Sequence, residues 1–142
     1  MIREATANDA EYIEGLYRLL LPDHPDIRVT PQRLGEISNN PDSFLYVYEV
    51  DHLIVGTVHL HLCMDALSGE RPFAVIERMI VTPEMRGAGY GAALMDHAEK
   101  RAAARGALKV MLSSAAGRAE AHVFYERLGY DGNGSKLFKK YL

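Results

Sequence analysis

Residues 81–91, Val-Thr-Pro-Glu-Met-Arg-Gly-Ala-Gly-Tyr-Gly, constrain the fold more than any other segment, because they predict a strand that ends in a glycine-rich turn opening a helix. Such a turn exposes successive backbone N–H groups at a helix N-terminus, where unpaired donors and the helix dipole favour a phosphate. Gly87, Gly89 and Gly91 allow the backbone to approach a ligand closely, and Arg86 adds a charged donor. Similar glycines also occur in plain strand-to-helix turns, so this segment alone leaves both interpretations open.

Two well-known phosphate-binding loops do not fit this turn. A P-loop requires Gly-Lys followed by Ser or Thr, and the dinucleotide-binding fingerprint requires Gly-x-Gly-x-x-Gly, whereas the spacing here is Gly-x-Gly-x-Gly. The sequence therefore argues against nucleotide hydrolysis and against hydride transfer.

The periodicity of apolar residues predicts an α/β fold in which a mixed sheet carries helices on its faces. Asp51-His52 is predicted to form a tight hairpin turn between two strands. The predicted strands are 2–5, 44–50, 53–62, 73–81, 109–113 and 136–141; the predicted helices are 7–20, a short helix that opens at Thr30-Pro31 and ends before Asn39, 89–105 and 119–128.

Length and composition narrow the class of protein. The chain has 142 residues without a linker or repeat, so we expect a single domain over residues 1–142. Cys63 is the one cysteine, and neither a secretory signal nor a membrane-spanning apolar run is present, so we expect a cytoplasmic protein without membrane contact. With 16 Lys and Arg against 19 Asp and Glu, and a net charge of -3, nucleic acid is not an expected partner.

Residues 86–91, Arg-Gly-Ala-Gly-Tyr-Gly, fit the pattern (Gln/Arg)-x-x-Gly-x-(Gly/Ala), the acetyl-CoA-binding signature of the GNAT superfamily of N-acetyltransferases, which this chain resembles. Residues 76–83 (Ile-Glu-Arg-Met-Ile-Val-Thr-Pro) and 121–130 (Ala-His-Val-Phe-Tyr-Glu-Arg-Leu-Gly-Tyr) also stand at the family's spacing, and the match is close over 73–142. The resemblance implies a central, twisted, mostly antiparallel sheet flanked by helices, with acetyl-CoA as the acyl donor. It also allows the chain to form a homodimer. Residues 113–130 look most like small-molecule acetyltransferases, such as those acting on aminoalkylphosphonates or on glucosamine phosphate.

The resemblance also implies the residues of the site. It assigns to Tyr125 the role of donating a proton to the departing thiolate. A phenol with an ordinary pKa of about 10 is still protonated at neutral pH and can therefore donate it. Packing of a helix onto the sheet is the alternative role for this aromatic residue. The implied acetyl-CoA-binding residues are Met79, Ile80, Val81, Arg86, Gly87, Ala88, Gly89, Tyr90, Gly91 and Ala92, with the backbone of a bulged strand at 79–81 near the thioester.

Glu77 is the first candidate for the base that accepts the proton of the amine. An acid on a largely apolar strand is costly to bury, which leaves a functional role or a buried salt bridge as explanations. Regular alternation predicts that Glu77 projects on the side of Val75 and Met79, opposite to Ile76 and Arg78. A histidine or a chain of water molecules remains an alternative base.

His59, His61 and Cys63 alternate along one predicted strand and therefore share a face. At ~3.3 Å per residue they extend over roughly 13 Å, too far for one tetrahedral ion, so we expect no metal site. They line a substrate pocket or form an ordinary strand face. No activating base is evident beside Cys63, which favours direct acetyl transfer in a ternary complex over a covalent intermediate.

The sequence thus predicts an N-acetyltransferase for a primary amine of a small molecule, with the amine itself left open. Two other functions compete: a catalytically silent acyl-CoA-binding regulatory module, and a protein or peptide N-acetyltransferase. The presence of Tyr125 and Glu77 favours an enzyme over a silent module.

Overall fold

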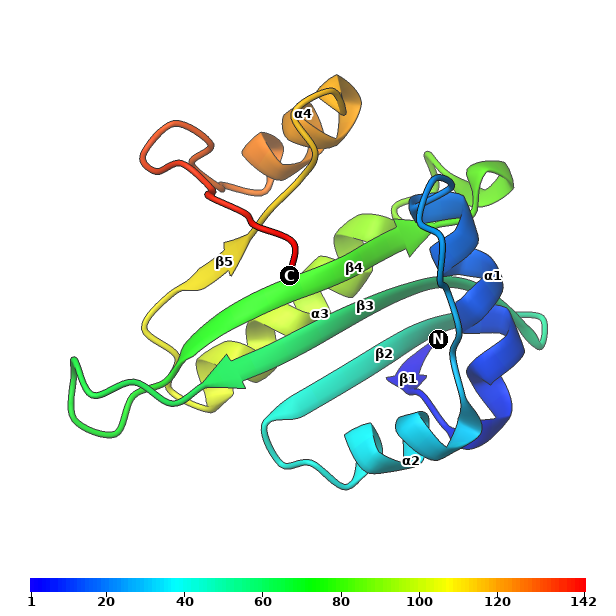
Figure 1. The fold of residues 1–142 in the computed structure, drawn as a ribbon, viewed down its shortest axis with the longest axis horizontal. Helices are drawn as coiled ribbons and strands as arrows, with labels where there is room; N and C mark the ends of the chain where they lie inside the picture. Colours follow the sequence, from blue (N-terminus) through cyan, green and yellow to red (C-terminus); the bar gives the residue numbers. More distant parts are fainter. The chain divides into compact units, whose positions relative to one another are not determined.

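A five-stranded sheet in the order β1-β2-β3-β4-β5 forms the centre of the fold (Figure 1). The computed structural model describes residues 1–142, which divide into two compact units, Met1–Met111 and Leu112–Leu142. The strands are β1 (Ile2–Glu4), β2 (Ser43–Val50), β3 (Leu53–Cys63), β4 (Phe73–Val81) and β5 (Val110–Leu112). β1 to β4 pair antiparallel, whereas β5 follows β4 in the same direction, so the sheet is mixed as predicted (Figure 1).

The predicted hairpin between β2 and β3 is present. Asp51 and His52 have φ values of 49° and 66°, and the flanking residues Val50 and Leu53 pair directly. Positive φ at both central residues is the geometry of the type I′ turn, whose twist matches that of the flanking strands. The turn joins β2 directly to β3, and the register of this pair shifts once, between Tyr48 and Glu49.

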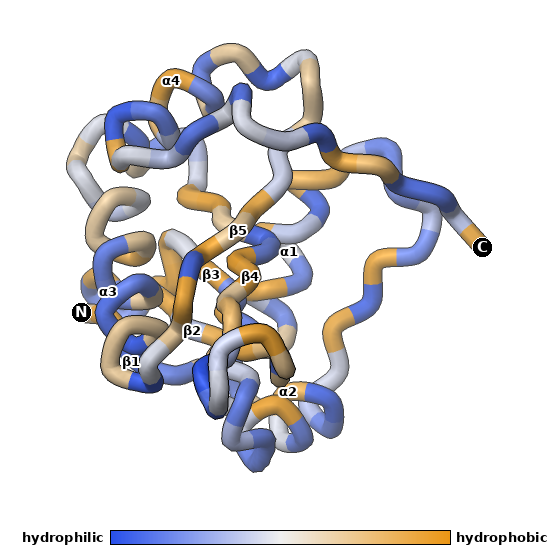
Figure 2. The backbone as a smooth tube through the Cα atoms, turned by 90° about the vertical axis from the view of Figure 1, so that its left-hand side faces the viewer, coloured by the Kyte–Doolittle hydropathy of each residue, from blue (hydrophilic) through white to orange (hydrophobic).

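Helices cover the two faces of the sheet (Figure 1). α1 (Ala10–Leu20) and α2 (Pro31–Ser38) lie on one face, where Ile13, Leu16 and Leu34 join a buried cluster with Leu45 and Val47 of β2. Together with Ile54 and Ile80 these residues form the apolar core of that face. Figure 2 shows hydrophobic segments along the strands of the sheet, including the edge strand β5.

α3 (Tyr90–Ala104) lies on the opposite face. Tyr46 of β2 is 1% exposed, and its ring meets His97 of α3 at 4.5 Å. α3 packs very closely on β3 at Gly56, where a Cβ atom would stand 3.0 Å from Leu94 Cδ1 and 3.1 Å from the carbonyl oxygen of Ile80. A residue without a side chain is needed for this approach.

Side chains cap the starts of the first two helical segments. Thr30 Oγ1 accepts a hydrogen bond from the N–H of Arg33 at 3.1 Å, with Pro31 as the first residue of α2. The segment predicted as one helix over 7–20 opens with a 3₁₀ turn, η1 (Ala7–Asp9), before α1. There the carboxylate of Asp9 accepts from the N–H of Thr6 at 2.7 Å.

The second unit contains α4 (Ala119–Arg127), and Gly129, which follows its C-cap residue Leu128, has φ 96°. His122 Nε2 lies 2.9 Å from the carbonyl oxygen of Ala115 and connects α4 to the preceding loop. The prediction of a strand at 136–141 is wrong, because these residues form no regular element. Apolar and β-forming side chains are present there, but a strand exists only where its backbone groups are paired with a neighbour. No helix of the structure is long and apolar enough to cross a membrane.

Candidate active site

The glycine-rich turn connects β4 to α3 through a 3₁₀ turn, η2 (Pro83–Met85). Gly87 and Gly89 have φ values of 84° and 85°, in the left-handed region that side chains rarely adopt. A Cβ atom at either position would meet nothing within 4 Å, so backbone conformation rather than crowding explains these glycines. The space in front of the turn is therefore open to a ligand.

Backbone donors face this open space. Ala93 is the first residue of α3 whose N–H bonds back to the turn, to the carbonyl of Gly89 at 3.0 Å. The earlier N–H groups, at the positive end of the helix dipole, remain available to an anion. This arrangement suits an anionic group such as the pyrophosphate that the family resemblance assigns to these residues.

Two contacts fix the turn against the sheet. Arg86 Nε donates to the carbonyl of Val81 at 3.2 Å, and the ring of Tyr90 meets that of Tyr48 at 4.6 Å. Of the predicted acetyl-CoA-binding residues, Arg86, Gly87, Ala88 and Gly89 are exposed, Met79, Tyr90, Gly91 and Ala92 are half-buried, and Ile80 and Val81 are buried. Because the side chains of Ile80 and Val81 belong to the core, these two residues can offer a ligand only their backbone.

β4 contains a bulge at Arg78 and Met79, which overlaps at Met79 the stretch 79–81 where the family resemblance implies one. Thr57 of β3 pairs with Ile80 and His59 pairs with Glu77, so two residues of β4, Arg78 and Met79, oppose one residue of β3. Arg78 has φ 55°, which is uncommon for a residue other than glycine. An extra residue of this kind bends a strand and changes the direction of the side chains that follow it.

The bulge corrects the side-chain directions expected from regular alternation. Ile80 packs in the cluster under α1, on the face of β3 that carries His59, the cross-strand neighbour of Glu77. Arg78 Nη1 lies 3.4 Å from Glu77 Oε2, so Arg78 does not project to the side opposite Glu77. The expectation that Met79 shares the side of Glu77 is also wrong, because the extra residue gives that place to Ile80.

A group of polar residues, here called the polar strip, lies on this face of the sheet. Its members are Ser43 of β2, His59 and His61 of β3, and Glu77 and Arg78 of β4. His59 Nε2 lies 2.7 Å from Ser43 Oγ, and the two imidazole rings are 3.9 Å apart. The side chains of Glu77 and Arg78 are 36% and 47% exposed, so the strip is open to solvent at β4.

The environment keeps both imidazoles of the strip neutral at physiological pH. Burial, followed by the charges of His61 and Arg78, lowers the pKa of His59 to about 3. Burial also lowers the pKa of His61, and the carboxylate of Glu77 partly opposes this shift. A neutral imidazole carries one acceptor nitrogen, so either ring can receive a proton or a hydrogen bond.

α1 borders the polar strip. Tyr17 packs against the apolar cluster under α1, and burial raises the pKa of its phenol to about 12, an effect that the charge of Arg78 partly offsets. The guanidinium of Arg78 therefore influences groups on both β3 and α1. The structure holds no group of three or more His, Cys, Asp or Glu side chains that could bind a metal ion.

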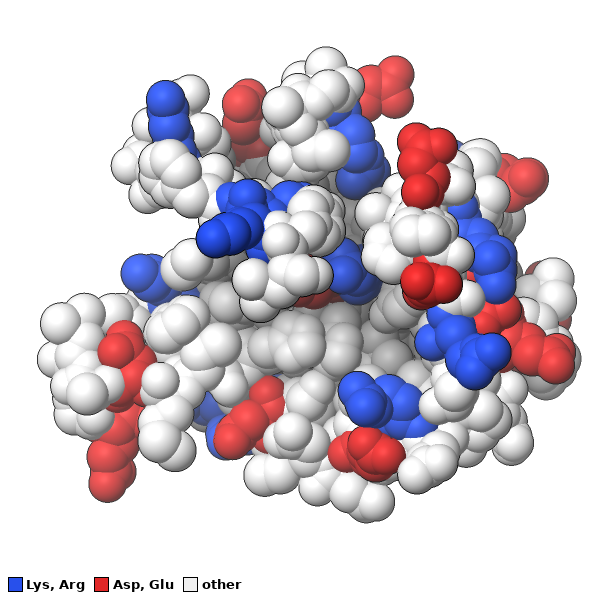
Figure 3. Space-filling view, viewed as in Figure 1, with Lys and Arg blue, Asp and Glu red and all other residues white.

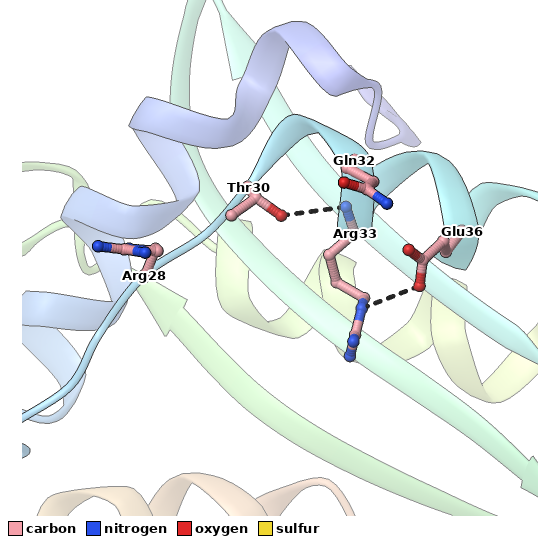
Figure 4. A pocket seen from close by; sticks show the side chains of 5 residues that line it. All are labelled: Arg28, Thr30, Gln32, Arg33 and Glu36. Carbon is pink, nitrogen blue, oxygen red and sulfur yellow. Dashed lines mark hydrogen bonds and ion pairs between the residues drawn. The ribbon is translucent and has the colours of Figure 1, made fainter.

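A hollow of about 390 Å³ lies at the beginning of α2 (Figure 4). It is lined by Arg28, Thr30, Gln32, Arg33 and Glu36, and Arg33 Nε pairs with Glu36 at 3.1 Å. Figure 3 shows basic and acidic side chains interspersed over the visible face, without a large patch of one sign. The hollow contains cations but no member of the polar strip.

Tyr125 belongs to the second unit, where it lies on α4. It is 8% exposed, and its ring contacts Phe124 at 5.1 Å and Tyr130 at 6.1 Å, both edge to face. These contacts support its packing role within the unit. Sequence reasoning missed Ser43 and Arg78 as members of the site, because the regular alternation expected for β4 placed Arg78 on the face opposite to Glu77.

Comparison with known proteins gives a consistent result. Residues 13–130 match the model of the acetyltransferase (GNAT) family. The chain is 29% identical over 129 residues to an aminoalkylphosphonate N-acetyltransferase of Salmonella typhimurium. The aligned region covers 91% of this chain and 83% of that protein.

Solved structures show the same fold. A glucosamine-6-phosphate N-acetyltransferase from Arabidopsis thaliana is 25% identical with a TM-score of 0.83, and covers 99% of this chain and 97% of that one. A protein of Agrobacterium tumefaciens str. C58, named only provisionally as an acetyltransferase, is 25% identical with a TM-score of 0.89, and covers 99% of both chains.

Proposed function

Because the chain belongs to the GNAT family of acetyltransferases, for which acetyl-CoA is the acyl donor, we propose that it acetylates the primary amine of a small molecule by direct transfer in a ternary complex. The observation that carries the proposal is the turn at Gly87 and Gly89, whose left-handed backbone leaves N–H donors at the start of α3 facing open space. The small-molecule acceptor is supported by the relatives, whose names specify an aminoalkylphosphonate and glucosamine 6-phosphate.

The turn and the bulge have separate roles in this proposal. Backbone donors from Gly87 to Gly91, with Arg86 beside them, bind the pyrophosphate of acetyl-CoA. The bulged backbone at Met79 supplies the N–H donor that stabilises negative charge on the thioester carbonyl oxygen during attack. Glycines suit the first role because the anion must approach the backbone itself.

Glu77 and Tyr125 are the proposed proton-transfer residues. An alkyl ammonium with a pKa near that of lysine, about 10.4, must lose a proton before it can attack, and Glu77 accepts this proton directly or through water. Its half-exposed carboxylate on the polar strip is open to such a substrate. Tyr125 donates its phenolic proton to the departing thiolate.

The test is a screen of amines with thiol release as the readout. Polyamines, amino sugars, aminophosphonates, aminoglycosides and basic peptides are each supplied with acetyl-CoA. We expect release with at least one small amine, and a decrease in kcat of about a hundredfold or more for Tyr125→Phe and for Glu77→Gln. Peptide acetylation alone would favour a protein acetyltransferase, and tight acetyl-CoA binding without thiol release would favour a silent regulatory module.

Cys63→Ser distinguishes direct transfer from a covalent route. Cys63 is a free, half-buried thiol at the end of β3, and direct transfer does not use it. We expect this variant to keep its activity. A loss of more than about a hundredfold would indicate an acetyl-cysteine intermediate.

A further inference from the structure

Arg78 is the one cation of the polar strip, and its backbone conformation is unusual. It occupies the bulge of β4 at φ 55°, although a left-handed conformation at a side-chain-bearing residue is unfavourable. Such conformations concentrate at binding and catalytic sites, where the surrounding structure holds them in place. The bulge brings the guanidinium to the face of Glu77, His59 and His61, from which regular alternation would have excluded it.

Most of the hydrogen-bonding capacity of Arg78 is unused. Its one contact is from Nη1 to Glu77 Oε2 at 3.4 Å, at the long end of the range for a hydrogen bond, and its side chain is 47% exposed. A guanidinium carries five N–H donors, and this single contact leaves most of them for another partner. Planar, paired N–H groups match the oxygens of a phosphonate, phosphate or carboxylate.

We propose that Arg78 binds an anionic group of the acceptor, a phosphonate, phosphate or carboxylate, a few bonds away from the amine that faces Glu77. This inference rests on the proposed function and defines its substrate class as an amine that also carries an oxyanion. The neutral rings of His59 and His61 can add N–H donors to the same oxyanion. Opposite charges on neighbouring residues of β4 thus orient a substrate whose own charges are opposite.

The hollow on α2 is the competing place for an anion. It contains Arg28 and Arg33, but Arg33 already pairs with Glu36 through Nε, and no proposed catalytic residue lines it. Arg78 is preferred because its only neighbour of opposite charge is the proposed base itself. Arg28→Gln and Arg33→Gln therefore serve as matched controls that remove the same charge elsewhere in the first unit.

The experiment compares three amines of similar length: 2-aminoethylphosphonate, β-alanine and the neutral 3-aminopropan-1-ol. Wild type, Arg78→Gln, Arg78→Lys and both controls are assayed for thiol release, after circular dichroism has shown that each is folded. We expect Arg78→Gln to lower the preference for the anionic amines over the neutral amine by at least about tenfold, mainly through KM, because a hydrogen bond to a charged group is lost. Arg78→Lys, which keeps the charge without the paired donors, should retain an intermediate preference.

Equal preference in wild type and Arg78→Gln, or an equal loss in Arg33→Gln, would overturn the assignment of Arg78. A preference for the phosphonate over the carboxylate, lost in Arg78→Gln, would identify the oxyanion class. Calorimetric titration of 2-aminoethylphosphonate into the CoA-saturated protein separates this inference from the proposed function. Binding that Arg78→Gln abolishes supports the anion site even if no amine is acetylated, whereas absence of binding to wild type refutes it.

Discussion

Acidification should destabilise this protein through His59 in particular. The ring lies on the polar strip with Ser43 Oγ 2.7 Å from Nε2, and the ring of His61 lies tilted beside it with its centroid 3.9 Å away. Burial, followed by the charges of His61 and Arg78, lowers its pKa from 6.5 to about 3 in the folded protein. The unfolded chain therefore binds a proton at His59 below about pH 6.5 while the folded protein does not.

The sign and size of the effect follow from this difference. Since the unfolded state binds more protons between the two pKa values, the free energy of unfolding decreases as the pH falls from 6.5 towards 3. At pH 4 the unfolded chain gains about 3 kcal/mol from protonation at this site, at about 1.4 kcal/mol per pKa unit. Protonation of His59 stabilises the folded protein by almost nothing at this pH, so the free energy of unfolding decreases by nearly the whole amount.

His59→Gln removes the titrating ring while keeping a polar group opposite Ser43. We expect urea unfolding, followed by far-ultraviolet circular dichroism between pH 7 and pH 4, to show a decrease in unfolding free energy about 3 kcal/mol smaller in His59→Gln than in wild type. His24→Gln, the same change in an exposed loop, is the control and should follow wild type. If wild type and His59→Gln lost equal stability over this range, the ring could not be held neutral as described.

Two further predictions concern the N-terminal ion pair and the glycine turn. Arg3→Gln should lower the free energy of unfolding by about 3 kcal/mol, because Arg3 donates to both oxygens of the buried Asp9 at 2.8 and 2.9 Å. Chemical denaturation measures this loss. A loss as small as that caused by Arg33→Gln, at an exposed arginine, would contradict the prediction. Gly89→Ala should cost about 1–2 kcal/mol through its left-handed backbone and should weaken acetyl-CoA binding in calorimetry, whereas Gly35→Ala in α2 should not. Unchanged stability and affinity in Gly89→Ala would refute the role of backbone conformation at the turn.

The parts of the fold that the sequence predicts correctly depend on local chemistry. Asp51-His52 forms its hairpin because Asp and His adopt positive φ more readily than most side chains, and Thr30-Pro31 opens α2 because a hydroxyl caps the first turn. Gly106, at φ 76°, follows the C-cap of α3 in the left-handed conformation that glycine adopts readily. Each signal involves neighbouring residues and requires no knowledge of distant contacts.

Pairing between distant strands is what the sequence does not predict. Residues 136–141 contain Leu, Phe and Tyr and look like a strand, yet Phe138 and Tyr141 are 88% and 81% exposed and no strand forms. Strand formation depends on an available partner, which β propensity does not report. The same reasoning explains why the sequence does not reveal Ser43 beside His59. The register that pairs Ser43 with His61, and so brings its hydroxyl within reach of His59, is fixed only in the folded sheet.

The bulge of β4 is the clearest case, because it changes the chemistry of the candidate site as well as its geometry. Regular alternation places Arg78 on the α3 face, where a charge among Leu94 and Met95 would be unpaired and costly. One extra residue in the strand turns the guanidinium to the solvent-accessible face of Glu77 and at the same time brings Ile80 into the core under α1. The same bulge buries Ile80 and exposes the guanidinium of Arg78 to solvent, which is favourable for both side chains. Its cost is one residue in the left-handed conformation. The alternation of Ile76, Arg78 and Ile80 is therefore a sign of a bulge, because a charge between two core positions of a regular strand has no favourable place to go.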